Sequence, residues 1–135
     1  MSILTKQCLI GFIAAPVPRP KSTEQGATRV QVRLRLPHWR RNPGGTFTPL
    51  KDTYCTLVAF DDVAQELYGR FTKGDKIIAA GVVRTSDEDR DGRAGPREQF
   101  VAYHVGHDAV RTRYVVDRPR VQAETLGLPV AAVGL

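Results

Sequence analysis

Residues 52–85 decide the fold of this chain, and they read DTYCTLVAFDDVAQELYGRFTKGDKIIAAGVVRT. Residues 54–60 are rich in β-branched and aromatic side chains and are largely apolar on both alternating faces, which predicts a strand within a packed sheet. Residues 76–85 predict a second strand. Its Gly81 lies where a tightly coiled small barrel commonly requires that a side chain be missing.

A short helix is expected between these two strands, at about residues 61–72. Asp61 or Asp62 can supply the N-cap oxygen, and Gly74 lies just beyond the expected end. The apolar side chains at helical spacing form one stripe that can pack on a core, and they are Val63, Ala64, Leu67 and Phe71. The order strand, short helix, strand is typical of the central segment of an oligonucleotide-binding (OB) barrel.

The same stretch resembles one family of proteins. Bacterial single-stranded DNA-binding proteins have an aromatic-bearing strand that ends in Phe, then a short helix, then the motif KGDxIxxxGxxRT. Here the strand ends in Phe60, and residues 73–85 read KGDKIIAAGVVRT. The resemblance spans roughly residues 3–110. It implies an all-β fold with one short helix, namely a five-stranded OB barrel with the helix between its third and fourth strands.

Length and composition indicate one globular domain. The chain has 135 residues, of which 41% are hydrophobic and 25% charged, and its net charge of +6 suits a polyanionic partner. Cys8 and Cys55 have no CxxC spacing, which is typical of a reduced cytosolic protein. No run approaches the roughly 20 apolar residues of a membrane span. Together with the family resemblance, these features predict a cytoplasmic, nucleoid-associated protein without membrane partners.

The segments before the central stretch add two expected strands. Residues 3–15 predict the first strand, and residues 16–26, which contain three prolines, predict a loop. Residues 29–36 alternate between an apolar face and a basic face. The basic face carries Arg29, Gln31, Arg33 and Arg35. Such a row can track a phosphate backbone, and the alternative is a solvated strand face paired with acids of a neighbouring strand.

Residues 37–52, PHWRRNPGGTFTPLKD, predict a long loop that holds the only tryptophan. Trp39 lies beside Arg40 and Arg41, so its indole can stack on a base while the two arginines hold phosphate. Two alternatives remain at this point. Trp39 can fold back to cap the barrel, or it can pack at a subunit interface.

The chain after the central stretch predicts a hairpin and a tail. Residues 86–98 read as a charged hairpin tip and residues 99–107 as a strand. Residues 108–116 are expected to form one extra strand, which resembles the added C-terminal strand of the high-GC bacterial members of the family. The expected domain is therefore residues 1–116, followed by a short flexible tail at residues 117–135.

The family resemblance implies which residues bind single-stranded DNA. Trp39 occupies the position of the loop tryptophan, Tyr54 replaces the tryptophan that opens the central strand, and Phe60 is the family's phenylalanine. Arg84 matches the arginine of the RT motif. The complete expected set is Arg33, Arg35, Trp39, Arg40, Arg41, Tyr54, Phe60 and Arg84.

The sequence also departs from the family pattern. Residues 86–89 read SDED where the family commonly has a fourth aromatic, and Cys55 stands where a histidine is usual. Because acids repel nucleic acid, a shorter or weaker binding path is expected.

No acid follows Glu124, whereas replicative members end in an acidic tip that recruits other proteins. The expectation is a short accessory paralogue or mobile-element version without this tip. The resemblance implies a homotetramer, with a dimer of dimers as one arrangement.

Enzymatic chemistry finds no support in the sequence, because it contains no recognisable nucleophile motif and no phosphate-binding glycine loop. His104 and His107 are three residues apart on an expected strand and therefore face opposite sides, which speaks against a metal site. No cofactor and no catalytic residue are expected.

The expected function is binding of single-stranded DNA without strong sequence preference, in an accessory role in replication, recombination, repair or DNA uptake. The pattern does not separate DNA from RNA. The alternative is an OB barrel that binds protein, either as a primosome-like subunit or as the partner of a replicative single-strand binder. An exposed Trp39 beside its arginines favours nucleic acid. A buried Trp39 with neutralised Arg33 and Arg35 favours a protein interface.

Overall fold

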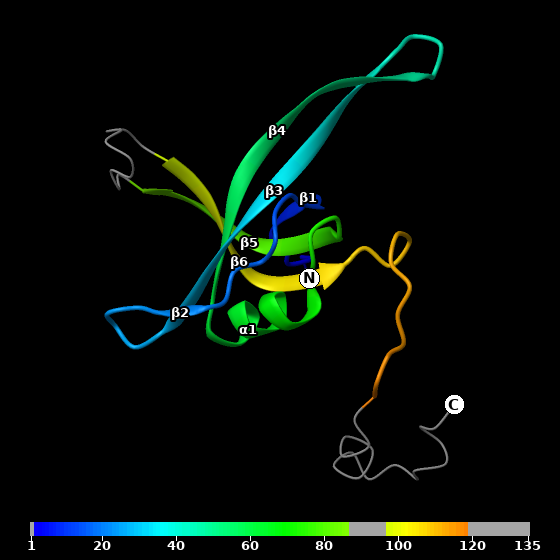
Figure 1. Ribbon diagram of the computed structural model, residues 1–135. Coiled ribbons are helices and arrows are strands. Elements are labelled where there is room, and N and C mark those ends of the chain that lie inside the picture. Colours follow the sequence, from blue (N-terminus) through cyan, green and yellow to red (C-terminus); the bar gives the residue numbers. More distant parts are fainter. Residues whose placement is uncertain (1, 87–96, 119–135) are drawn as a thin grey trace.

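The structure is a computed structural model that describes residues 2–86 and 97–118. In these residues the chain forms six strands and one helix (Figure 1). In chain order they are β1 (Gln7–Ile13), β2 (Lys21–Ser22), β3 (Thr28–Arg41), β4 (Phe47–Phe60), α1 (Asp61–Arg70), β5 (Lys76–Ser86) and β6 (Arg97–His107).

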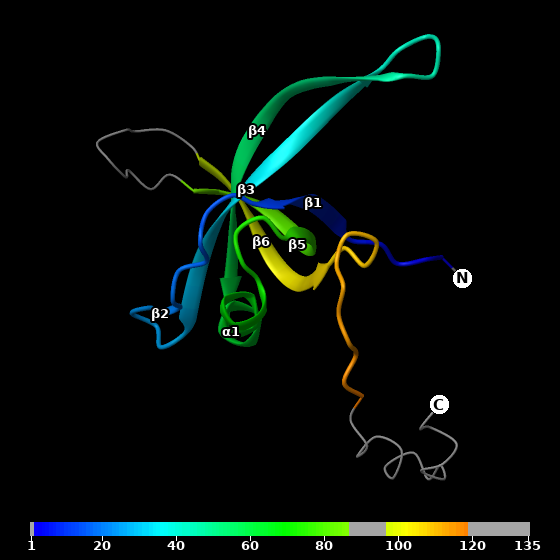
Figure 2. The ribbon, with the colours of Figure 1, turned by 45° about the vertical axis from the view of Figure 1, so that its right-hand side comes forward.

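Five of the strands close into a barrel. The sheet order is β1-β5-β6-β4-β3-β2, and β1 also pairs with β3 through Phe12↔Arg35 and Ile13↔Leu34. The pair β4–β6 is parallel, and the other pairs are antiparallel. This arrangement confirms the expected all-β OB barrel with one short helix. Figure 2 shows the long β3–β4 ribbon extending away from the barrel, with β2 and α1 at the opposite end.

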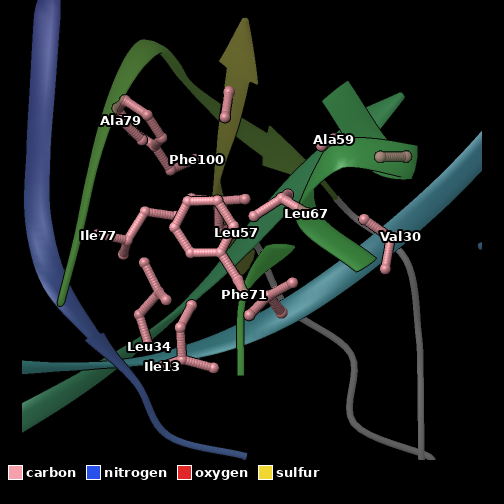
Figure 3. Packing of buried hydrophobic residues seen from close by; sticks show 13 residues of the cluster. Ile13, Val30, Leu34, Leu57, Ala59, Leu67, Phe71, Ile77, Ala79 and Phe100 are labelled. Carbon is pink, nitrogen blue, oxygen red and sulfur yellow. The ribbon is translucent and has the colours of Figure 1, made fainter. Parts of the chain in front are cut away.

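The barrel core is formed by the inward side chains of the strands and is covered at one end by α1. Ala64 and Leu67 of the helix are buried, Phe71 packs beside them, and Val63 is half-buried against the same cluster. This confirms the apolar stripe expected from the sequence. The buried cluster comprises Ile13, Val30, Val32, Leu34, Leu57, Ala59, Ala64, Leu67, Phe71, Ile77, Ala79, Phe100 and Ala102 (Figure 3).

Gly81 has the role in the barrel that the sequence predicted. A Cβ at this position would lie 1.8 Å from the carbonyl oxygen of Val101 on β6. The register of β5 against β6 also shifts between Ala80 and Gly81. The missing side chain therefore lets the two strands approach where the barrel coils.

The prediction of a long loop over residues 37–52 is wrong. β3 and β4 continue through most of it as a paired ribbon, from His38↔Leu50 to Arg41↔Phe47. The register shifts between Leu36 and His38, so Pro37, which has no N–H to donate, lies at a β-bulge. The ribbon turns at residues 42–46, where the Asn42 amide donates to the Thr46 carbonyl over 2.8 Å.

The expected N-cap is also wrong. The N-cap residue of α1 is Phe60, and no side chain caps the helix there. Asp61 has a φ of 51°, and its Oδ1 accepts a hydrogen bond of 3.2 Å from the Thr28 amide. The carboxylate therefore ties the start of the helix to β3.

Several element limits differ from the sequence predictions. β1 begins at Gln7, later than expected, and the proline-rich segment contains the short strand β2. The extra strand expected over residues 108–116 is not formed: residues 109–111 make a turn, and residues 112–118 have no regular structure. The reason is local, because the Asp108 side chain accepts a hydrogen bond from the Val110 amide and closes the turn.

Residues 87–96, which include most of the expected hairpin tip, and residues 119–135, which include nearly all of the expected tail, lie outside the described part of the chain. Across residues 2–86 and 97–118 no helix is long and apolar enough to span a membrane.

Candidate nucleic-acid interface

The expected arginines and aromatics of β3 and β4 share one face of the sheet. Arg33 is paired with Thr56, Arg35 with Tyr54, and Arg29 with Phe60. Directly opposite residues of an antiparallel pair project from the same side. We call this surface the outer face, because Val30, Val32 and Leu34 project from the other side into the core. The outer face comprises Arg29, Arg33, Arg35, Thr56, Tyr54 and Phe60.

Two arginines of the outer face lie over aromatic rings. The Arg33 guanidinium carbon is 4.9 Å from the centre of the Tyr54 ring, and that of Arg35 is 4.6 Å from the centre of the Phe12 ring. Arg35 also forms an ion pair of 3.3 Å with Asp52. Within the described residues Arg33 has no acidic partner, so its charge faces solvent beside a ring that is 51% exposed. Arg33 and Tyr54 therefore offer a cation and a π-face together.

Cys55, the residue that stands in place of the family's histidine, does not belong to this face. It pairs with Leu34 and packs in part against the core. Burial raises the pKa of its thiol, and the charge of Arg33 offsets part of that effect. Cys55 is therefore a packing residue.

The ribbon beyond the bulge, residues 38–51, extends the outer face, and we call it the arm. Its pairs Trp39↔Pro49 and Arg41↔Phe47 place Trp39, Arg41 and Phe47 on one side. Alternation along β3 carries the outer face onto this side of the arm. Trp39 and Phe47 are each 60% exposed. Trp39 is therefore exposed on the side that also carries Arg41, which is the arrangement that favours nucleic acid. The register places Arg40 on the opposite side of the arm.

Arg84 joins the outer face from β5. The pairs Val58↔Val101 and Val101↔Val82 continue one face from β4 across β6 to β5, and Arg84 follows two residues after Val82 on the same side. Its Nη2 donates a hydrogen bond of 3.5 Å to the hydroxyl of Tyr103, whose side chain is 44% exposed.

Sequence reasoning missed three aromatic residues of this surface: Phe12, Phe47 and Tyr103. Phe47 could have been found, because the NPGG segment at residues 42–45 is a turn signal between two runs that can pair. The positions of Phe12 and Tyr103 on this surface depend on the closure of the barrel and on the register shift near Gly81. No local sequence signal reveals either feature.

The two histidines considered as a metal fragment do not combine with other ligands. Among the described residues no group of three or more His, Cys, Asp or Glu side chains could hold a metal ion. The ring of His107 stacks on Phe71 with centroids 3.9 Å apart, and its Nε2 lies 3.1 Å from Asp75 Oδ2. His107 is thus a packing residue at the edge of the core.

The sequence matches no protein-family model and no curated protein. Several solved structures share the fold. A small single-stranded DNA-binding protein from Streptomyces coelicolor superposes with a TM-score of 0.66 at 20% identity, over 80% of this chain and 97% of that one. The single-stranded DNA-binding protein of Thermus aquaticus gives a TM-score of 0.64 at 18% identity, over 77% of this chain and 50% of that one. An SSB of Plasmodium falciparum in complex with single-stranded DNA gives 0.62 at 15% identity, over 79% of this chain and 96% of that one.

At these identities the likeness establishes the fold. The chain has the OB barrel found in these single-stranded DNA-binding proteins.

Proposed function

We propose that this protein binds single-stranded DNA without strong sequence preference, along the outer face and the arm. The observation that carries the proposal is the arm itself. Trp39 and Phe47 are each 60% exposed and share one side with Arg41. They continue the face on which the Arg33 guanidinium lies over the Tyr54 ring. The likeness of the barrel to those of single-stranded DNA-binding proteins supports the same ligand.

The surface combines the two interactions that hold a single strand. Aromatic rings stack on bases of any sequence and contribute about 1–3 kcal/mol per base. Arginines contact phosphates, and each contact steepens the fall of log K with log salt concentration by about 0.7. Trp39, Tyr54, Phe60 and Phe47 would supply the stacking, and Arg33, Arg35, Arg41 and Arg84 the phosphate contacts. Arg40, on the opposite side of the arm, would contribute less.

A protein ligand is the second candidate, and the ion pair between Arg35 and Asp52 favours it locally. A large protein interface is usually depleted of charge at its centre. Here Arg33 lies over the Tyr54 ring and Arg41 lies opposite Phe47, and neither arginine has an acidic partner in the described residues. That arrangement fits a polyanion better than an apolar protein surface.

The family resemblance supports a finer proposal. The protein would be a short, high-GC-type member of the bacterial single-stranded DNA-binding proteins, with an accessory role in replication, recombination, repair or DNA uptake. It would act as a homotetramer in the cytoplasm and would bind rather than catalyse, since stacking and phosphate contact require no reacting group.

The test is fluorescence anisotropy with a labelled oligo(dT), a labelled mixed-sequence single strand and a labelled duplex, each at low and moderate salt. The proposal predicts similar affinity for both single strands and much weaker binding of the duplex. Equal binding of duplex and single strand would indicate a merely basic surface. No binding of any DNA at low salt would favour the protein-interaction function.

A further inference from the structure

A second basic surface lies at the end of β3 opposite the arm, beside the short strand β2. A pocket of about 280 Å³ opens there, and Arg19, Lys21 and Arg29 are among its lining residues. Among residues 2–86 and 97–118 no acidic side chain lines this pocket. Within the described part of the chain none of the three cations forms an ion pair.

The placement of two of these cations is unfavourable unless an anion binds. Lys21 on β2 and Arg29 on β3 are directly opposite in an antiparallel pair. Their side chains therefore share a face with Cβ atoms about 4.5–5.5 Å apart, and like charges in this arrangement destabilise a sheet. A phosphate between the two would convert the repulsion into two charge-assisted contacts.

The wall of the pocket is held in place before any ligand arrives. The hairpin after β2 is closed by hydrogen bonds from the Thr23 amide to the Ala27 carbonyl, 2.6 Å, and from the Gly26 amide to the Thr23 carbonyl, 3.1 Å. The Thr23 hydroxyl also accepts a bond of 3.2 Å from the Ala27 amide. A preformed site loses less entropy on binding.

The pocket is continuous with the outer face. Arg29 pairs with Lys21 on one side and with Phe60 on the other, so these three residues form a row across β2, β3 and β4. Neighbouring strands are about 4.8 Å apart, which places the row within roughly 10 Å. A nucleotide stacked on Phe60 therefore has its backbone within reach of both cations.

We propose that this pocket binds a backbone phosphate of the single strand, which crosses the sheet from Phe60 to the β2 hairpin. The inference rests on the proposed function and adds a phosphate site to it. Free inorganic phosphate has the same chemistry, and the experiment separates the two sources.

The experiment measures the salt dependence of oligo(dT) affinity for the wild-type protein, Lys21→Ala and the double variant Arg19→Ala/Lys21→Ala. Lys6→Ala, which removes an exposed charge ahead of β1, is the matched control. The pocket holds one phosphate, and loss of one phosphate contact flattens the slope of log K against log salt by about 0.7. The double variant should therefore lose about 0.7, Lys21→Ala no more than that, and Lys6→Ala nothing. Without DNA, Lys21→Ala should melt no lower than wild type, because the repulsion from Arg29 is gone.

Two results would overturn the site. Wild-type binding with unchanged slopes in both variants would remove the pocket from the strand's path and leave the proposed function standing. A free-anion site would give the same unchanged slopes and a second signature. Inorganic phosphate would then shift the amide NMR signals of residues 23–27 in the wild-type protein, and Lys21→Ala would abolish these shifts. Failure of the wild-type protein to bind any single strand would reject the proposed function itself, and the strand path with it.

Discussion

β3 and β4 form the arm and also part of the five-stranded barrel, and the side chains of the two regions differ in what they contact. In the barrel, β3 buries Val30, Val32 and Leu34, and the choice of residue follows from packing. In the arm no residue is fully buried, yet Trp39, Phe47 and Leu50 are large and apolar. Folding gives no reason for such residues there. The exposed aromatics on the arm are therefore better explained by a ligand than by the core.

The same contrast bears on flexibility. A two-stranded ribbon without a core is marginally stable in water, so the arm can open or bend at a cost well below that of global unfolding. The barrel half of the outer face is fixed by the packed sheet beneath it. We expect the barrel to position the strand and the arm to adjust to it.

The largest expected effect is on the free energy of unfolding, which a glycine substitution should lower in the barrel but not in the arm. Gly81→Ala would place a Cβ 1.8 Å from a backbone oxygen, whereas a Cβ at Gly44 in the turn of the arm meets nothing within 4 Å. We expect Gly81→Ala to lower the free energy of unfolding by about 3 kcal/mol or more, or to prevent folding. Gly44→Ala should change it by less than about 0.5 kcal/mol. Urea denaturation of both variants measures this, and equal stabilities would contradict the tight approach of β5 and β6.

The next largest effect is on DNA affinity, which a substitution in the arm should lower without affecting the stability of the barrel. Trp39→Ala should weaken oligo(dT) binding by about 1–3 kcal/mol and leave the unfolding midpoint nearly unchanged, because the indole stacks on a base and not on the core. Leu50→Ala, on the opposite side of the arm, is the matched control and should bind as wild type. At moderate salt Trp39→Ala should lose more affinity for oligo(dT) than any variant with a single arginine replaced. Equal losses at all salt concentrations would rule out stacking at Trp39.

A smaller effect tests which side of the arm carries the strand. Arg41 shares the side of Trp39 and Phe47, and Arg40 lies on the other. Arg41→Ala should flatten the salt slope by about 0.7, whereas Arg40→Ala should alter it little. Anisotropy titrations over a range of salt measure both. A larger change for Arg40→Ala would place the strand on the opposite side of the arm.

The smallest effect concerns only the barrel. Partial burial opposes ionisation of Asp75, but hydrogen bonds from the Thr72 amide and from His107 outweigh it and lower the pKa of the carboxyl. A lowered pKa contributes stability above the unfolded value of about 3.9, and this contribution is lost as the pH falls through the folded pKa. Asp75→Asn should therefore cost about 1 kcal/mol at pH 7 and progressively less below about pH 4.

Thermal melts across this pH range measure the effect, with exposed Asp62→Asn as the control. A pH-independent difference between wild type and Asp75→Asn would contradict the role of the carboxylate. DNA binding at pH 7 should be nearly unchanged, since the hydrogen bonds of the Asp75 carboxylate go to Thr72 and His107 and not to the outer face or the arm.

The sequence was informative where local pattern and tertiary packing agree. The strand at residues 54–60, the helix stripe and Gly81 could all be predicted, because the alternating or helical spacing of apolar residues reflects the core directly. The arm was missed, since neither side of it is buried and Pro37 and Pro49 resemble loop signals. Its one local signal was the NPGG turn at residues 42–45. The N-cap was mispredicted because Asp61 bonds to Thr28, a contact set by the closure of the sheet. Of the candidate site, Trp39 was singled out from the sequence with its exposure left open. The contact between Arg84 and Tyr103 depends on strand register, which the sequence does not reveal.

The central claim is that a base stacks on the arm, and Trp39, the only tryptophan of the chain, reports that place directly. The most direct measurement is titration of its intrinsic fluorescence with oligo(dT) at moderate salt. We expect strong quenching that saturates at a defined stoichiometry. Unchanged emission, while a gel assay shows the oligonucleotide bound, would place the strand elsewhere and contradict the claim.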